Sequence, residues 1–555
     1  MTFLLVFFTS LVTTLFLTPF FIAFLKKTKI VDLPGGRKIH KDVIPRMGGL
    51  IIFLVVLTMI NAFVDDFNSI KLVIISATIL VFAGIIDDVI SLNRFVKFVI
   101  QNISAVILVY YLQPLYTSVS LFGITFSNPY DYLILLLFVI GTVNSINFLD
   151  GLDGLASGFA LLVFSVLLAL AIRKNDTFLI LLTISLLGSL LGFLRFNAFP
   201  ASVFLGDTGA LILGFFLIFI SFLTSIDYHE SVLDLTFPLI LLAVPILDTV
   251  KVFFLRIIQK TDPFTADRKH QHHILQKSIV SHEITVFVLL IFSLFFILLA
   301  MFYLKDFRTE TTIIFFVFGA MLIGIQPLLL RFKVTDVMEK LLHGLKELHV
   351  ENIFLIIKAF MFVSAILLVI ISVASFSFTT SLNLSETIFL AIATFMLFGL
   401  SLFQSKKIES INHLGVFINF SIFFIVSKLS LPFISTSNLN INVLDLIHNV
   451  SFYLLVLLIS LTMILRWKAF LGKRILFSGI DLTLIVLMML TFIINKILEF
   501  DYNYYLSVSL LEAFIFYVWY KIVVDIKKNY ANRLIFISFI LPMVLLITLL
   551  IKKVI

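Results

Sequence analysis

Residues 144–158 read NSINFLDGLDGLASG and follow directly on an apolar run at residues 132–143. The stretch contains two asparagines, two aspartates and three glycines, and the chain is apolar again from Phe159 onward. Carboxylates and glycines at the edge of a bilayer-spanning segment are costly, so they indicate a functional site. The alternative is a polar loop between helices, which needs fewer Asn, Asp and Gly residues than this stretch holds.

The composition indicates a helical membrane protein. Of the 555 residues, 61% are hydrophobic and 13% are charged, whereas a soluble domain has roughly 45–50% apolar and 25% charged residues. The mean hydropathy is +1.17. The absence of cysteine excludes disulfides and thiol redox chemistry. The net charge of +8 is gathered in short loops, where it reports membrane topology and not binding to nucleic acid.

We therefore predict an all-α polytopic membrane protein with about eleven spans in the first part of the chain and about seven in a C-terminal extension. The first run, residues 3–25, is too long for a signal-peptide core and is expected to be a retained helix. The basic residues that follow it place that loop in the cytoplasm. Under this count, the polar stretches described below all lie on the cytoplasmic face. The basic pair Arg173 and Lys174 breaks the rule, because it would lie outside.

Two local features of the spans can also be predicted. Residues 117–129 alternate between apolar and polar side chains, which indicates a short β-hairpin on the outer side. The ninth span, near residues 235–255, contains Pro238 and Pro245 and is expected to be kinked.

Cations and carboxylates gather at two of the cytoplasmic ends. The loop at residues 31–49, VDLPGGRKIHKDVIPRMGG, is dense in positive charge at the membrane surface. It is either a topology determinant that touches lipid head groups or a site for an anionic substrate. Asp87 and Asp88 end the third span, and Lys97 follows them. These acids either cap a turn or line a polar opening, with one facing a metal or nucleophile and the other a basic partner.

A third stretch, residues 195–215, contains Gly206-Asp207-Thr208-Gly209. The glycines let the backbone approach a ligand closely, and Asp207 offers a carboxylate. Mg²⁺ prefers such oxygen ligands and usually takes one or two carboxylates together with substrate phosphates.

The fourth stretch, RIIQKTDPFTADRKHQHHIL at residues 256–275, places three histidines beside basic residues. Zinc is disfavoured, because H-x-H-H lacks the i, i+4 spacing of a helical zinc pair and no cysteine is present. A phosphate or a sugar suits these histidines better.

These motifs, taken together and in order, resemble the polyprenyl-phosphate N-acetylhexosamine-1-phosphate transferases, a glycosyltransferase family, over about residues 1–335. The motifs that carry the resemblance are Val31-Asp32, Arg37-Lys38-x-His40, Pro45-Arg46-x-Gly48-Gly49, Asp87-Asp88, Asn144-x-x-Asn147-x-x-Asp150-Gly151-x-Asp153-Gly154, Gly206-Asp207-x-Gly209 and Asp267-x-x-His270-x-His272-His273. The last loop resembles bacterial enzymes that begin O-antigen, common-antigen or teichoic-acid linkage units. The related muramoyl-pentapeptide transferases usually carry three consecutive histidines there, which Gln271 interrupts, so that branch is the second candidate.

The resemblance implies a role for each matching residue. Asn147 and Asp207 would hold Mg²⁺, with Mn²⁺ as an alternative. The residues implied in catalysis are Asp87, Asp88, Asp150, Lys97, His272 and His273, and those implied in substrate binding are Arg37, Lys38, His40, Gly151, Asp153, Phe204, Asp267, Arg268 and His270. A phosphate monoester is already mostly ionised at neutral pH, so we expect the aspartates to position the lipid phosphate and not to deprotonate it. Phe204 would stack on uracil; the alternative is that it is a packing residue. For Asp150, the alternative to a catalytic role is that it only stabilises the conformation of its loop.

The activity implied is the transfer of an N-acetylhexosamine 1-phosphate, most often N-acetylglucosamine 1-phosphate, from a UDP-sugar to undecaprenyl or another polyprenyl phosphate. UMP would be released, and the site would face the cytoplasm from a bacterial inner membrane. A lipid or solute transporter is the alternative of another class, but it would place its charges near the bilayer midplane. The sequence leaves open whether the protein is a homodimer. It predicts a transferase domain at 1–335, an amphipathic cytoplasmic linker at 336–352 and an accessory membrane domain of unknown function at 353–555.

Overall fold

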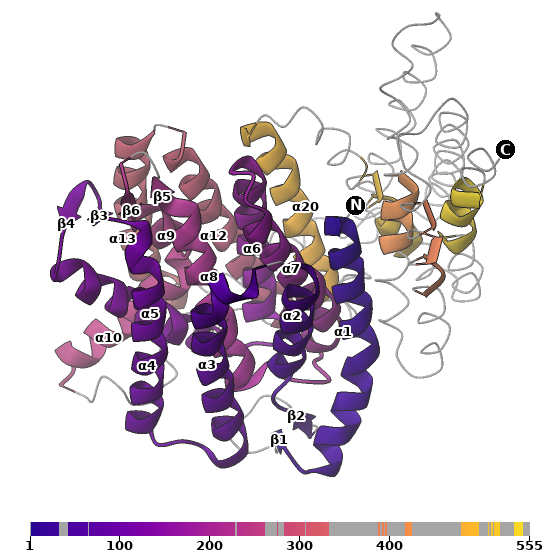
Figure 1. Ribbon diagram of the computed structural model, residues 1–555, viewed down its shortest axis with the longest axis horizontal. Helices are drawn as coiled ribbons and strands as arrows, with labels where there is room; N and C mark the ends of the chain where they lie inside the picture. The colour runs from indigo at the N-terminus through magenta and orange to yellow at the C-terminus, as the bar shows by residue number, and fades with distance from the viewer. Residues whose placement is uncertain are drawn as a thin grey trace, which may run out of the picture. The chain divides into compact units, whose positions relative to one another are not determined.

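The computed structural model describes residues 2–32, 43–64, 66–227, 230–260, 275, 282–305, 307–331 and 479–498, with shorter stretches between 387 and 547 (Figure 1). The chain divides into two compact units. One consists of Thr2–Met338 and Gly479–Leu487, and the other of Met1, Glu339–Ser478 and Met488–Ile555. The first unit contains every part of the site described below. The predicted linker at 336–352 lies outside the described residues.

Helices make up almost all of the first unit. They are α1 (Thr2–Lys27), α2 (Gly49–Phe63), α3 (Lys71–Ile90), α4 (Arg94–Leu112), α5 (Tyr130–Leu149), α6 (Leu155–Arg173), α7 (Thr177–Asn197), α8 (Gly206–Ser225), α9 (Thr236–Leu241), α10 (Ala243–Ile258), α12 (His282–Tyr303), α13 (Arg308–Arg331) and the first half of α20 (Gly479–Leu498). In the described part of the chain, eight helices are long and apolar enough to cross a membrane. The prediction of an all-α polytopic membrane protein is therefore confirmed, whereas the count of eleven plus seven spans is not.

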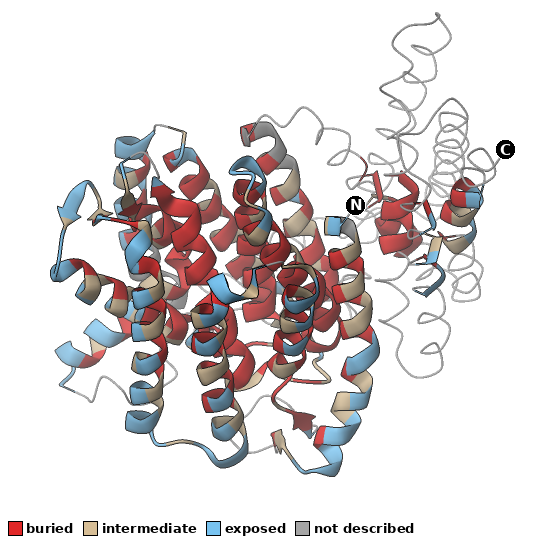
Figure 2. Ribbon diagram, in the orientation of Figure 1, coloured by how far each residue is buried: buried red, intermediate tan, exposed pale blue. Residues whose placement is uncertain are grey.

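The central helix of this unit is α8, which is buried from Thr208 to Ser225 (Figure 2). It packs against α2, α3, α5 and α6. Glycine permits two of these close crossings: a Cβ on Gly49 of α2 would lie 1.9 Å from Gly209 Cα, and one on Gly84 of α3 would lie 2.3 Å from Thr208 Cα. The start of α8 is thus pressed between the ends of two helices that come earlier in the chain.

The variant Gly49→Ala is expected to lower the free energy of unfolding by about 3 kcal/mol, at the upper end of typical overpacking losses, because its methyl group would meet backbone that cannot rotate away. Gly141→Ala on α5 is the matched control. A Cβ there meets no atom within 4 Å, and alanine favours a helix over glycine by about 1 kcal/mol. Thermal unfolding of both purified variants in detergent measures the difference, and equal midpoints would contradict the close crossing.

Small β-structures lie at opposite ends of the helices (Figure 1). At one end, β1 (Val31–Asp32) pairs with β2 (Ile44–Pro45). At the other, β3 (Ser118–Leu121), β4 (Ile124–Phe126), β5 (Ile226–Asp227) and β6 (Val232–Asp234) form a sheet in the order β4-β3-β6-β5. Strands β3 and β4 are the antiparallel hairpin predicted at 117–129. The sheet therefore marks the end of the unit that lies away from β1 and β2.

Two other details of the spans have a structural explanation. The predicted ninth span consists of two helices, α9 and α10, that meet at Leu242 between Pro238 and Pro245, so the expected kink is confirmed. The Lys174 ammonium donates hydrogen bonds to the carbonyl oxygens of Leu223 and Ile226, both at 3.0 Å. It thereby satisfies carbonyl groups at the C-terminal end of α8, and burial lowers the pKa of Lys174 to about 8. The charge that broke the topology rule thus has a local structural role.

Candidate active site

The turn between α3 and α4 brings an acidic and a basic side chain together. Helix α3 ends at Ile90, and Ser91 follows with a φ of 54°. The Asn93 side chain then accepts a hydrogen bond from the Phe95 amide and begins α4. Within this turn, the Leu92 amide donates to Asp87 Oδ1 at 2.6 Å. The reversal of the chain places Lys97, in the first turn of α4, beside the last turn of α3.

Lys97 bridges two carboxylates from different helices. Its Nζ lies 2.7 Å from Asp87 Oδ2 and 2.7 Å from Asp207 Oδ1. The side chains of Lys97, Asp87 and Asp207 are 17%, 11% and 29% exposed, so the ion pairs are screened less than surface pairs. Two negative charges against one positive charge leave the cluster with one net negative charge. This cluster can still accept a cation.

Asp88 has a different partner from its neighbour. Its Oδ1 accepts from the Asp207 amide at 3.0 Å, and its Oδ2 accepts from the Thr208 amide at 3.1 Å and the Thr208 hydroxyl at 2.7 Å. A carboxylate at this place satisfies the free amides of the first turn of α8 and interacts favourably with the helix dipole. Asp88 therefore determines where Asp207 lies.

We predict that Asp88→Asn lowers the free energy of unfolding by about 1–3 kcal/mol, because the new amide group turns an acceptor toward α8 into a donor that faces other donors. Asp66→Asn is the matched control. The exposed Asp66 carboxylate accepts one amide hydrogen bond, from Ser69. An asparagine side-chain oxygen at this position can accept the same hydrogen bond. Thermal unfolding of both variants decides the matter. Equal losses would mean that the contacts of Asp88 with α8 contribute little.

The loop between α5 and α6 supplies a third group of acids. Asp150 caps the C-terminal end of α5, and Gly154 begins α6 with a φ of 77°. Asp153 Oδ2 accepts from the Ala201 amide at 3.0 Å, which ties this loop to residues 198–205 between α7 and α8. Burial, together with the negative charges of Asp207, Asp88 and Asp153, raises the pKa of Asp150 well above its ordinary value. The acids at the end of α3, in the α5–α6 loop and at the start of α8 are thus close enough to interact electrostatically.

The two asparagines of α5 differ in their contacts. The Asn144 side chain donates to Gln101 Oε1 on α4 at 2.9 Å and to the Ile140 carbonyl at 2.8 Å, so it holds α4 and α5 together. Asn147 lies one turn further along and is half-buried. Among the described residues, no hydrogen bond involves the side-chain amide group of Asn147. Asn147 is therefore available to bind a ligand, whereas Asn144 is a structural residue.

The donor chemistry of this end fits Mg²⁺. Asp207, Asp87 and Asn147 offer carboxylate and amide oxygens, which are the ligands that a hard cation prefers. Among the described residues, no group of three or more His, Asp or Glu side chains forms a complete metal cage. A site with one or two protein ligands, completed by phosphate oxygens, is nevertheless the usual arrangement for Mg²⁺. The residues present therefore fit this ion in a site that the substrate would complete.

Phe204 lies beside this cluster on an ordered backbone. Its amide donates to the Pro45 carbonyl at 2.8 Å, and its carbonyl accepts from Gly48 at 3.0 Å. Its side chain is half-buried. Close by, Asp32 of β1 forms an ion pair with Arg46, the residue that follows β2. The flanks of the predicted cationic loop are thus anchored at the same end of the unit as the acids.

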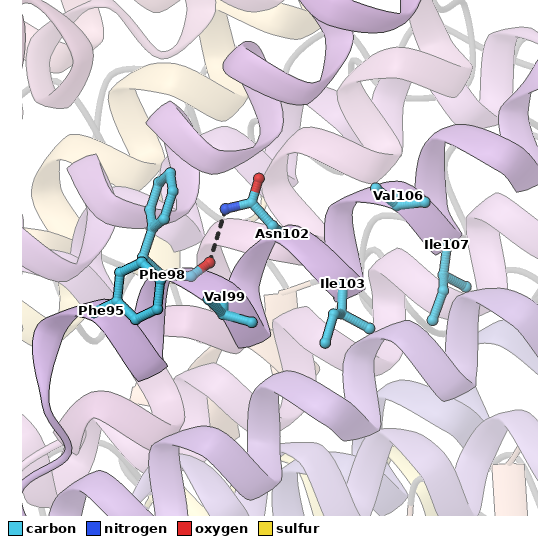
Figure 3. A pocket seen from close by; sticks show the side chains of 7 residues that line it. All are labelled: Phe95, Phe98, Val99, Asn102, Ile103, Val106 and Ile107. Atoms are coloured by element: carbon cyan, nitrogen blue, oxygen red, sulfur yellow. Dashed lines mark hydrogen bonds between the residues drawn. The ribbon is translucent and has the colours of Figure 1, made fainter.

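An apolar depression runs along α4 from its first turn (Figure 3). It has a volume of about 410 Å³ and is lined by Phe95, Phe98, Val99, Asn102, Ile103, Val106 and Ile107. These residues occupy one face of α4, whereas Lys97 is turned toward Asp87 and Asp207. Sequence reasoning missed this face, although its i, i+3, i+4 spacing of apolar side chains is visible in the printed chain.

The structure therefore joins part of the predicted site. Asp87, Asp88, Lys97 and Asp207 are linked by hydrogen bonds. The negative charges of Asp207 and Asp88 act on Asp150, and Asp153 is hydrogen-bonded to the loop at 198–205. Gly151 is exposed in the same turn. Eight predicted residues lie outside the described residues and stay predictions: Arg37, Lys38, His40, Asp267, Arg268, His270, His272 and His273.

Comparison with known proteins identifies relatives of this arrangement. Residues 70–225 match the family described as glycosyl transferase family 4. A probable undecaprenyl-phosphate N-acetylglucosaminyl 1-phosphate transferase of Bacillus subtilis (strain 168) is 34% identical over 303 residues, which cover 52% of this chain and 82% of the relative. The undecaprenyl-phosphate alpha-N-acetylglucosaminyl 1-phosphate transferase of Thermotoga maritima is 31% identical over 290 residues, covering 52% and 87%. The protein of that name from Escherichia coli (strain K12) is 25% identical over 284 residues, covering 49% and 76%.

Proposed function

The chain belongs to glycosyl transferase family 4, and we propose that it transfers N-acetylglucosamine 1-phosphate from a UDP-sugar to undecaprenyl or another polyprenyl phosphate. An oxygen of the lipid phosphate would form a bond to the phosphorus next to the sugar. The bond between the two phosphates of the UDP-sugar would break, and UMP would leave. The observation that carries this proposal is the bridge from Lys97 to Asp87 and Asp207 at the ends of three helices.

The charges of this cluster suit a reaction between two anions. Phosphoryl transfer depends mainly on positioning and on electrostatic stabilisation, with little covalent work for the protein. Lys97 would give up part of its contact with the carboxylates to a phosphate oxygen, and Asp87 would keep it oriented. Mg²⁺, when bound by Asp207 and Asn147, would screen the charge of the diphosphate. Because a phosphate monoester is already mostly ionised, none of the aspartates has to remove a proton.

The apolar face of α4 suits the hydrocarbon tail of the acceptor. Phe95, Phe98 and Val99 lie within two residues of Lys97 in sequence, and 39–72% of their surface is exposed. The phosphate of a polyprenyl phosphate would reach Lys97 at head-group depth while its tail lay against this face. We further propose that the site faces the cytoplasm from a bacterial inner membrane, in line with the positive loops of the sequence.

The assay for this function is the release of UMP. Purified protein in detergent, mixed with UDP-N-acetylglucosamine, undecaprenyl phosphate and Mg²⁺, should produce UMP and a lipid-linked sugar diphosphate. Omission of the polyprenyl phosphate is the control and should abolish the product. If a panel of UDP-N-acetylhexosamines yields no UMP, the transferase proposal fails and a transporter becomes the better reading.

Phe204→Leu is expected to raise the KM for the UDP-sugar about tenfold with little change in kcat, because stacking of a base on an aromatic ring contributes about 1–3 kcal/mol. Initial rates over a range of UDP-sugar concentrations measure both constants. Phe82→Leu is a suitable control, because Phe82 is 60% exposed on α3 and lies outside the cluster. An unchanged KM would make Phe204 a packing residue.

A further inference from the structure

The first half of α20 packs inside the first unit, although it begins at residue 479. A Cβ on Gly479 would lie 3.4 Å from the Phe199 amide nitrogen and 3.8 Å from Ala198 Cβ. One turn later, Thr483 is 1% exposed, and its Cγ2 lies 3.2 Å from a Cβ built on Gly158 of α6. Helix α20 thus contacts both α6 and the loop that follows α7.

The loop at 198–205, called the α7–α8 loop, connects this contact to the proposed site. Beside Gly479, the Phe199 ring stacks on the ring of His282, with centroids 4.4 Å apart. The Ala201 amide donates a hydrogen bond to the Asp153 carboxylate. The backbone of Phe204 forms hydrogen bonds with the backbone of Pro45 and Gly48. Asp207 follows in the first turn of α8. A displacement at Phe199 would therefore act on Phe204 and Asp207 through a short chain of backbone contacts.

Helix α20 lies far beyond the matched family region, which ends at residue 225. We propose that α20 is a positioning element for the transferase site. Gly479 and Thr483 hold the α7–α8 loop and α6 in the arrangement that places Phe204 and Asp207. The effect on UDP-sugar binding rests on the proposed function, whereas the contact and the effect on the loop do not. Residues 479–487 of the C-terminal extension are, in this proposal, part of the machinery that orients the site.

Cross-linking tests the contact, because the natural chain has no cysteine. The 3.8 Å between Cβ positions of Ala198 and Gly479 matches the Cβ separation in disulfides, about 3.8 Å on average. The double variant Ala198→Cys/Gly479→Cys, denatured before labelling, should lose its reactivity to a maleimide after mild oxidation and regain it on reduction. Gly158→Cys/Thr483→Cys is the second pair. The control pair Tyr110→Cys/Gly479→Cys should stay reactive, because α4 and α20 lie well apart (Figure 1). If both test pairs stay reactive, the proposal is overturned.

A second experiment tests positioning. Gly479→Leu should raise the KM for UDP-N-acetylglucosamine at least about fivefold with a smaller change in kcat. Gly479→Ala should shift KM far less, because its methyl group makes ordinary contacts. A purely structural loss would lower the yield of folded protein and leave KM unchanged. Met489→Ala, on an exposed part of α20, controls for substitution in this helix.

A readout independent of the proposed function uses Ser202→Cys in the α7–α8 loop, whose hydroxyl normally bonds to the Phe196 carbonyl. Adding Gly479→Leu to this reporter should increase its labelling rate by a maleimide several-fold, and adding Met489→Ala should not. An unchanged labelling rate overturns the positioning role, whether or not the protein releases UMP. Faster labelling in a protein that releases no UMP would support the role of α20 and reject the transferase proposal alone.

Discussion

Asp207→Asn is expected to lower the rate of UMP release at least about 10³-fold. The reason is that the Asp207 carboxylate is both a proposed Mg²⁺ ligand and an ion-pair partner that orients Lys97. The substitution keeps the size of the side chain and removes its charge. Within the described part of the chain, Lys97 then keeps its ion pair with Asp87, and the proposed Mg²⁺ ligand set loses its carboxylate. The amide contacts of Asp88 with the backbone of Asp207 and Thr208 do not require the Asp207 side chain. The fold should therefore persist.

The measurement is UMP release at saturating substrates over a titration of Mg²⁺. Loss of a metal ligand should also raise the Mg²⁺ concentration needed for half-maximal rate. Asp176→Asn is the matched control, because Asp176 also receives an amide hydrogen bond at the start of a helix, from Leu179 at 3.0 Å, and asparagine is an equally good cap. Rates near those of the unaltered protein in Asp207→Asn would remove Asp207 from the metal site.

Lys97→Met is expected both to reduce UMP release at least about 10²-fold and to lower the free energy of unfolding by about 3 kcal/mol, because removal of one partner leaves largely buried charges without compensation. Asp87 and Asp207 would then face the space left by the ammonium, with no cation between them. Addition of Mg²⁺ should recover part of the stability, since a divalent cation can replace the missing positive charge. Lys71→Met, at the exposed start of α3, is the control.

The double variant Lys97→Met/Asp87→Asn separates the two effects. It removes one positive and one negative charge, so its stability should return most of the way toward that of the unaltered protein, while its activity stays low. Thermal unfolding with and without Mg²⁺, together with UMP release, gives both quantities. If the single variant Lys97→Met unfolds at the same temperature as the unaltered protein, the bridge contributes no stability.

The adjacent acids at the end of α3 illustrate the limit of sequence-based prediction. Their position at the end of a span, with a lysine close behind, was readable from the chain. Neighbouring residues on a helix point about 100° apart, so Asp87 and Asp88 could not share one partner. Which of them meets Lys97 and which meets the start of α8 depends on where α8 lies, and α8 is more than a hundred residues further along the chain. The capping role of Asp88 was therefore not predictable.

The sequence by itself determined that this is a multi-pass helical membrane protein of the transferase family, because apolar runs of bilayer length and the ordered polar motifs are properties of the chain that need no contacts. It also determined the hairpin at 117–129 and the break near Leu242, which local alternation and proline decide. Only the tertiary structure decided that Lys97 joins Asp87 to Asp207, that Lys174 satisfies carbonyls of α8, and that Gly479 packs beside Ala198. These pairings join segments far apart in the chain. The packing of the helices decides which distant residues come into contact, and the sequence of each segment alone does not specify that packing.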